Sequence, residues 1–234
     1  MHVLRFEAPA QGGPGTPPAR GSADRPGPQP MVNAPWPVVA VTLAIVAAYF
    51  VQSRYPLRWV EEALGFSPLL MLQGHPERLI SSIFVHGNWA HALMNAAFCL
   101  AFGAPVARVL GRGAGGAAAY FLFFLATGVF ASFGFAATHW NQNVLAIGAS
   151  GAASGLMGAA ARIIGGQGRV GPLFSPAVLQ MGGAWVIINV IMALTGGLLI
   201  PGSGDAVIGW EAHLAGFAAG VLLIGPFAWL AGRR

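Results

Sequence analysis

Residues 147–160 read IGASGAASGLMGAA. This stretch begins a segment that is apolar enough to enter a lipid bilayer, yet it opens with Ser150 and Ser154 set among glycines. An unpaired polar group in an apolar environment costs on the order of 1–3 kcal/mol by mutational measures. The two hydroxyl groups therefore need partners, and the small residues around them predict that another helix comes very close.

The composition of the chain is that of a membrane protein. Of its 234 residues, 56% are hydrophobic and only 8% are charged, whereas an average soluble domain has roughly 25% charged residues. The net charge of +5 comes from arginines that lie singly or in one terminal pair, so no basic run indicates a nucleic-acid partner. The single cysteine, Cys99, excludes an intramolecular disulfide framework. We expect a polytopic α-helical membrane protein in contact with the lipid bilayer.

Apolar runs of 17 or more residues, the length that crosses about 30 Å of hydrocarbon, follow an N-terminal part of different character. Residues 1–35 contain eight of the 17 prolines and many glycines, which predicts a disordered cytoplasmic tail without a signal peptide. Met31 leaves a downstream start open. Residues 36–234 are expected to form one domain with six spans, at 36–52, 88–107, 116–137, 149–166, 173–200 and 209–231.

The arginines favour one orientation of these spans. With six spans, one side of the membrane receives most of them: Arg5, Arg20, Arg25, Arg108, Arg112, Arg162, Arg169, Arg233 and Arg234. The link 53–87 on the other side carries three arginines, balanced by three glutamates. By the positive-inside rule the arginine-rich side is cytoplasmic, so both termini are expected inside.

Polar clusters lie at the start of the second, fourth and sixth spans. His86 lies just before the second span, and His91 and Asn95 are four residues apart, on one helical face. Ser150 opens the fourth span, and His213 lies about one turn into the sixth. Because all three spans run from outside to inside, the clusters are expected at one depth, just below the outer surface.

Small residues four apart prepare the fourth and sixth spans for close packing. Gly151 and Gly155 repeat on one span, and the segment GFAAG at 216–220 repeats the pattern on the other. Such stripes let membrane helices pack backbone to backbone. Packing of this kind would bring Ser150 within reach of His213, which together make a nucleophile and its general base.

Hydrolysis of a peptide bond passes through a tetrahedral oxyanion, and each donor aimed at it contributes roughly 10²–10³ in rate. The candidate donors at the depth of Ser150 are Asn95, His86 and the backbone N–H of Ser150 itself. Glu211 does not complete a triad, since residues two apart on a helix do not face each other. His86 and His91 are five apart, which does not set two imidazoles on one helical face, so no metal site is expected.

Taken together, the motifs HGNWAHALMN (86–95), GASG (148–151) and AHLAGFAAG (212–220) resemble the rhomboid family of intramembrane serine proteases. Their order and spacing agree with the family over about residues 36–231. The resemblance implies an all-α, six-helix rhomboid-like bundle. It also implies a catalytic dyad of Ser150 and His213 without an acidic third member, and no cofactor.

The resemblance further assigns roles around the dyad. It implies that Asn95 and His86 stabilise the oxyanion, that His91 is a structural neighbour, and that the link 201–208 acts as a mobile cap over the site. Substrates would be single-span or polytopic membrane proteins, cleaved near the outer membrane surface. A bacterial inner membrane is the expected location, and the oligomeric state and physiological substrate stay open.

Two positions depart from the family pattern. Family members often carry an aromatic residue four positions after the nucleophile, stacked on the catalytic histidine, where this chain has Ser154. Another side chain, such as an aromatic elsewhere, would then have to orient His213. The first outer link often carries a Trp-Arg pair, where this chain reads Glu77-Arg78.

Other interpretations of the same residues are weaker. Ser154 is a rival nucleophile on the same helical face, but no glycine stands two positions before it. A transporter would place polar groups near the bilayer midplane and not at one surface. The alternative that remains is a catalytically inactive rhomboid-like protein that binds transmembrane helices, although such a protein would normally lose Ser150 or His213.

Overall fold

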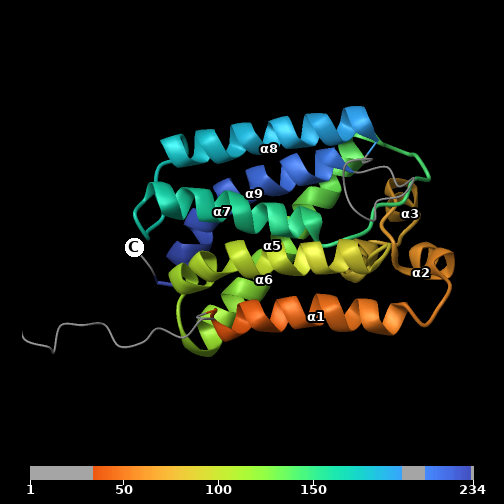
Figure 1. Ribbon diagram of the computed structural model, residues 1–234, viewed down its shortest axis with the longest axis horizontal. Coiled ribbons are helices and arrows are strands. Elements are labelled where there is room, and N and C mark those ends of the chain that lie inside the picture. Colours follow the sequence, from red (N-terminus) through yellow and green to blue (C-terminus); the bar gives the residue numbers. More distant parts are fainter. Residues whose placement is uncertain (1–33, 197–208, 233–234) are drawn as a thin grey trace, which may run out of the picture. The chain divides into compact units, whose positions relative to one another are not determined.

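The computed structural model describes residues 34–196 and 209–232 of the chain (Figure 1). The elements of this part are α1 (Trp36–Gln52), α2 (Leu57–Leu64), α3 (Pro68–Leu72), α4 (Arg78–Ser81), η2 (Ser82–Phe84), α5 (Trp89–Leu110), α6 (Gly113–Thr138), α7 (Ser150–Gly165), α8 (Pro176–Thr195) and α9 (Trp210–Leu230). The only β-structure among these residues consists of isolated bridges. The predicted all-α class is therefore confirmed.

The six predicted spans coincide with six of these helices, α1 and α5 to α9. Four of the six, α5, α6, α8 and α9, are long and apolar enough to cross a membrane, and α1 is a shorter apolar helix. These helices make the chain a multi-pass membrane protein. The predicted tail up to residue 33, the end of the fifth predicted span and the predicted cap at 201–208 lie outside the described residues.

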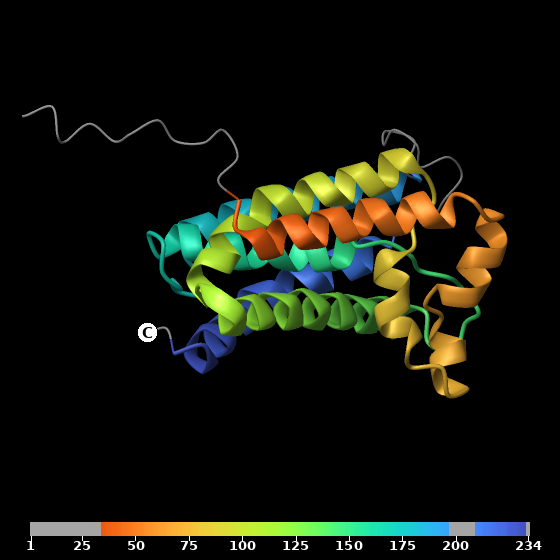
Figure 2. The same cartoon turned by 90° about the horizontal axis from the view of Figure 1, so that it is seen from below.

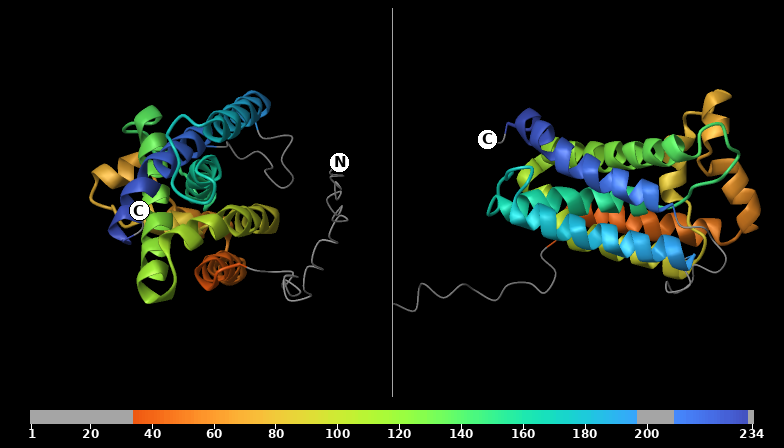
Figure 3. Two further views of the ribbon diagram at one scale, coloured as in Figure 1. Left: turned by 90° about the vertical axis from the view of Figure 1, so that its left-hand side faces the viewer. Right: turned by 90° about the horizontal axis from the view of Figure 1, so that it is seen from above.

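α7 is the central helix of residues 34–232. It packs against α5, α6, α8 and α9, and the end-on view in Figure 3 shows it with other helices around it. Twelve of its 16 residues are buried. Glycine, alanine and serine dominate its sequence, so its neighbours can approach it from every side. At 1.5 Å per residue α7 is about 24 Å long, less than the ~30 Å of a hydrocarbon core.

α5, α7 and α9 all begin at one end of the bundle (Figure 1). The short helices α2, α3 and α4 of the link 53–87, which the sequence analysis did not predict, gather at this same end (Figure 2). Arg78 Nη1 donates to the carbonyls of Glu62 and Gly65, at 2.7 and 3.1 Å. Phe66 exchanges backbone hydrogen bonds of 3.0 and 2.8 Å with Ala146. The link is thereby fastened to the segment that leads into α7.

Candidate active site

α7 and α9 touch along their glycine stripes. A Cβ atom on Gly216 would collide with the carbonyl of Gly151, and one on Gly220 would collide with the carbonyl of Gly155. Thr127 of α6 occupies the space that a Cβ atom on Gly155 would need. The close packing that the stripes predicted is therefore confirmed, and it brings the first turns of α7 and α9 together.

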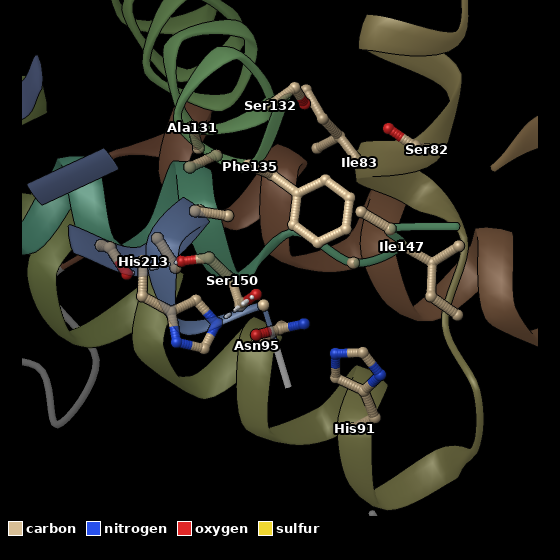
Figure 4. A pocket seen from close by; sticks show the side chains of 18 of the residues that line it. Ser82, Ile83, His91, Asn95, Ala131, Ser132, Phe135, Ile147, Ser150 and His213 are labelled. Carbon is tan, nitrogen blue, oxygen red and sulfur yellow. Dashed lines mark hydrogen bonds between the residues drawn. The ribbon is translucent and has the colours of Figure 1, made fainter. Parts of the chain in front are cut away.

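Ser150 and His213 meet at this junction (Figure 4). Ser150 is the first residue of α7, and His213 lies in the first turn of α9. The Nε2 atom of His213 lies 2.9 Å from the Oγ atom of Ser150. His213 is buried, with 8% of its surface exposed. A hydroxyl within hydrogen-bond distance of an imidazole nitrogen is the arrangement that activates a serine nucleophile.

The other nitrogen of the His213 ring faces α8. Its Nδ1 atom lies 2.8 Å from Oδ1 of Asn189, which is fully buried. The ring of Trp185, one turn earlier on α8, lies 5.8 Å from the His213 ring between centroids, at an interplanar angle of 38°. Neither Asn189 nor Trp185 was predicted from the sequence. A polar amide in the long apolar run that follows Gln180 was the signal that could have drawn attention to Asn189.

Ser154 has its hydroxyl in use within α7. Its Oγ atom donates to the backbone carbonyl of Ser150 at 2.7 Å, four residues earlier. The side chain is almost fully buried, and the hydrogen bond that His213 accepts comes from Ser150. The aromatic neighbour of His213 is Trp185 of α8, so α8 supplies the ring that position 154 lacks.

Asn95 and His91 line the cavity next to Ser150 (Figure 4). The Nδ2 atom of Asn95 is buried and has no hydrogen-bond partner among the described residues. Both side chains lie against Gly148, whose φ of +112° and lack of a Cβ leave room for them. Because Gly87 N–H donates to His91 Nδ1 at 3.4 Å, the His91 proton is left on Nε2.

His86 lies behind this wall and does not line the cavity. Its Nε2 atom accepts from the backbone N–H of Ala149 at 3.4 Å, and its Nδ1 lies 3.3 Å from the carbonyl of Phe84. Burial, with a smaller contribution from His91, lowers the pKa of His86 to about 3, so the ring is neutral. Both ring nitrogens are engaged away from the cavity. The oxyanion role expected of His86 stays a prediction, and of the two histidines it is His91 that lies at the cavity beside Asn95.

The site opens into a cavity of about 1130 Å³. Its wall is mainly apolar and includes Phe135, Ile147 and Trp185, with Ser150 and His213 at one side (Figure 4). Small-molecule sites usually occupy 300–1,000 Å³, so this cavity can hold several residues of an extended peptide. A few convergent polar groups in an apolar cavity are the usual features of a binding or catalytic site.

The described residues form an all-helical, multi-pass membrane fold, with a serine–histidine contact at one end of its helices. The model of the Rhomboid domain matches residues 73–229, which contain every residue of the site. The chain belongs to the rhomboid family. No curated protein matches it.

Proposed function

We propose that this chain is an active intramembrane serine endopeptidase in which Ser150 is the nucleophile and His213 the general base. The observation that carries the proposal is the 2.9 Å contact between Ser150 Oγ and His213 Nε2 inside a largely apolar cavity. A serine that served only as a helix cap would not need a buried histidine as its partner. The Nδ2 atom of Asn95 beside this pair, which has no hydrogen-bond partner among residues 34–196 and 209–232, adds a donor for a developing oxyanion.

The proposed reaction begins when His213 Nε2 takes the hydroxyl proton while Ser150 Oγ attacks the carbonyl carbon of the scissile bond. The carbonyl oxygen becomes an oxyanion, which accepts hydrogen bonds from Asn95 Nδ2, His91 Nε2–H and the backbone N–H of Ser150. His213 then protonates the leaving amine, and an acyl-enzyme remains. Water, deprotonated by His213, hydrolyses the ester and regenerates Ser150.

In this proposal residues 36–234 form a six-span domain, with α1 and α7 as the two spans that are shorter than the rest. Arg108 and Arg112, near the end of α5, and Arg162 and Arg169, near the end of α7, lie away from the site. The positive-inside rule puts that end in the cytoplasm, with both termini, and puts the site near the outer surface. Substrates are membrane proteins whose helices enter the cavity near that surface, and a bacterial inner membrane is the proposed location.

Cleavage of a single-span reporter in proteoliposomes tests this proposal. Ser150→Ala should lower kcat by about 10⁴-fold or more, because no nucleophile remains. Ser154→Ala is the matched control on the same helix, and it should cleave nearly as wild type because its hydroxyl bonds only within α7. A folded wild type that binds the reporter without cleaving it would favour the inactive, helix-binding alternative.

A further inference from the structure

Asn189 stands out from the rest of α8. Three of the 20 residues of this helix are buried, namely Val178, Asn189 and Met192. Most of the others are exposed apolar side chains, such as Ile187 and Leu194. A fully buried amide on such a helix carries a desolvation cost unless both of its polar atoms find partners.

Both polar atoms of the Asn189 amide have partners, and the two partners fix its orientation. The Nδ2 atom donates to the carbonyl of Trp185 at 2.8 Å, and a carbonyl can only accept. The Oδ1 atom is therefore the one that lies 2.8 Å from His213 Nδ1. A flipped amide would set an N–H against Nδ1 and lose the bond to Trp185.

This orientation determines where His213 carries its proton. Since Oδ1 has no hydrogen, the neutral imidazole must be protonated on Nδ1 to make the bond. Its Nε2 atom then carries a free lone pair and lies 2.9 Å from Ser150 Oγ. That tautomer is the one a general base requires, and the other tautomer would point an N–H at the serine.

Trp185 and Asn189 act from one face of α8, because residues four apart share a face. The Trp185 carbonyl holds the Asn189 amide, and its indole ring rests against the His213 ring. Phe98 of α5 backs the indole, with ring centroids 6.0 Å apart. The ring of His213 is thus held from its Nδ1 edge and from one side by a single helical turn.

We propose that Asn189 is a positioning residue that sets the tautomer and orientation of His213, with Trp185 as the aromatic support. The side chains that orient His213 therefore come from α8. Position 154 of α7 carries a serine and has no aromatic ring to place against His213. This inference rests on the proposed function, since it concerns the base of that reaction. The bond to a neutral amide also persists when His213 becomes protonated, and it brings no second buried charge into the site.

The test compares Asn189→Leu, which has a similar size and no acceptor, with Asn189→Asp, which keeps an acceptor oxygen. Leu should lower kcat by about 10–100-fold, a part of the 10²–10⁴ that general-base catalysis supplies, with KM little changed. Asp should recover most of the lost kcat. Val190→Leu, at the neighbouring exposed position, is the matched control and should behave as wild type.

Nitrogen NMR of ¹⁵N-histidine-labelled protein reads the tautomer directly, with His213→Ala used to assign the signal. Wild type should show a protonated Nδ1, and Asn189→Leu should show a mixture of tautomers. A wild-type signal from the Nε2-protonated form, or Asn189→Leu with unchanged kcat, would overturn the positioning role. A wild type with the expected tautomer but no cleavage would instead overturn the proposed function and leave the positioning intact, so the two failures are distinguishable.

Discussion

α7 and α8 both reach the site, but the bundle holds them in different ways. α7 carries Ser150 and is buried along almost its whole length, against four other helices. α8 carries Asn189 and Trp185 and is mostly exposed, with three buried residues. The nucleophile therefore derives its position from dense backbone packing, which tolerates no added atom. The base is held by a few specific side-chain contacts from a lightly packed helix. Changes in packing should therefore displace Ser150, and changes in single polar groups should displace His213.

The largest effect should follow from filling the contact between α7 and α9. Gly220→Leu would push a side chain into the carbonyl of Gly155. Overpacking costs about 1–3 kcal/mol or more, so we expect the melting temperature in detergent to fall by about 5–10 °C and cleavage to disappear. Gly183→Leu on α8 is the control, because open space surrounds that glycine. Equal losses in both variants would contradict the contrast between the two helices.

Removal of the Asn95 amide should leave the fold intact and slow the reaction. Asn95→Ala should lose about 10²–10³-fold in kcat, the effect of one oxyanion donor, with a weak residual activity. Steady-state cleavage of the reporter measures this loss. Leu93→Ala, an exposed neighbour outside the cavity, should keep wild-type kcat. Unchanged kcat in Asn95→Ala would remove this amide from the proposed mechanism.

A smaller effect is expected from the ring that supports His213. Trp185→Ala should slow acylation by a small fluorophosphonate about 2–10-fold, the free energy of one aromatic contact. Trp185→Phe keeps an aromatic ring, so its rate of acylation should fall less than that of Trp185→Ala. The small probe separates alignment of the base from binding of a long substrate. Acylation of Trp185→Phe that is as slow as that of Trp185→Ala would contradict a role for the ring contact.

The last effect is on stability alone and concerns the support that His86 gives to the start of α7. Its folded-state pKa of about 3 lies below the ordinary value of about 6.5, so the unfolded chain takes up a proton first as the pH falls. Stability should therefore decrease from about pH 6.5 downward. Melting temperatures at pH 7 and pH 5 measure the decrease, which should be less steep in His86→Gln. His75 is exposed, so the melting temperature of His75→Gln should fall with pH as it does in wild type. An equal fall in wild type, His86→Gln and His75→Gln would contradict this role of His86.

The sequence predicted the parts of the molecule that periodic patterns control. Long apolar runs located the helices to within a few residues, and the glycine stripes with matching polar depths paired Ser150 with His213. The family resemblance is confirmed by the Rhomboid domain match. These features were predictable because each depends on spacing along one helix or on alternation across the bilayer.

Features that depend on rotation or on loop geometry were not predictable. Whether Asn189 meets His213 depends on how α8 turns about its axis, and no local pattern encodes that angle. The choice between His86 and His91 depends on the turn at Gly87, which points one ring away from the cavity and leaves the other at its wall. The short helices of the link 53–87 are held by contacts distant in sequence, such as the pairing of Phe66 with Ala146.

The most direct test of the central claim is labelling of the detergent-solubilised protein with a serine-reactive fluorophosphonate. Wild type is compared with Ser150→Ala, Ser154→Ala and His213→Ala. We expect labelling of wild type and of Ser154→Ala, and none of the other two variants, because the activated hydroxyl is that of Ser150 and its base is His213. A folded wild type that takes no label, or labelling that is lost with Ser154 and kept without Ser150, would contradict the account.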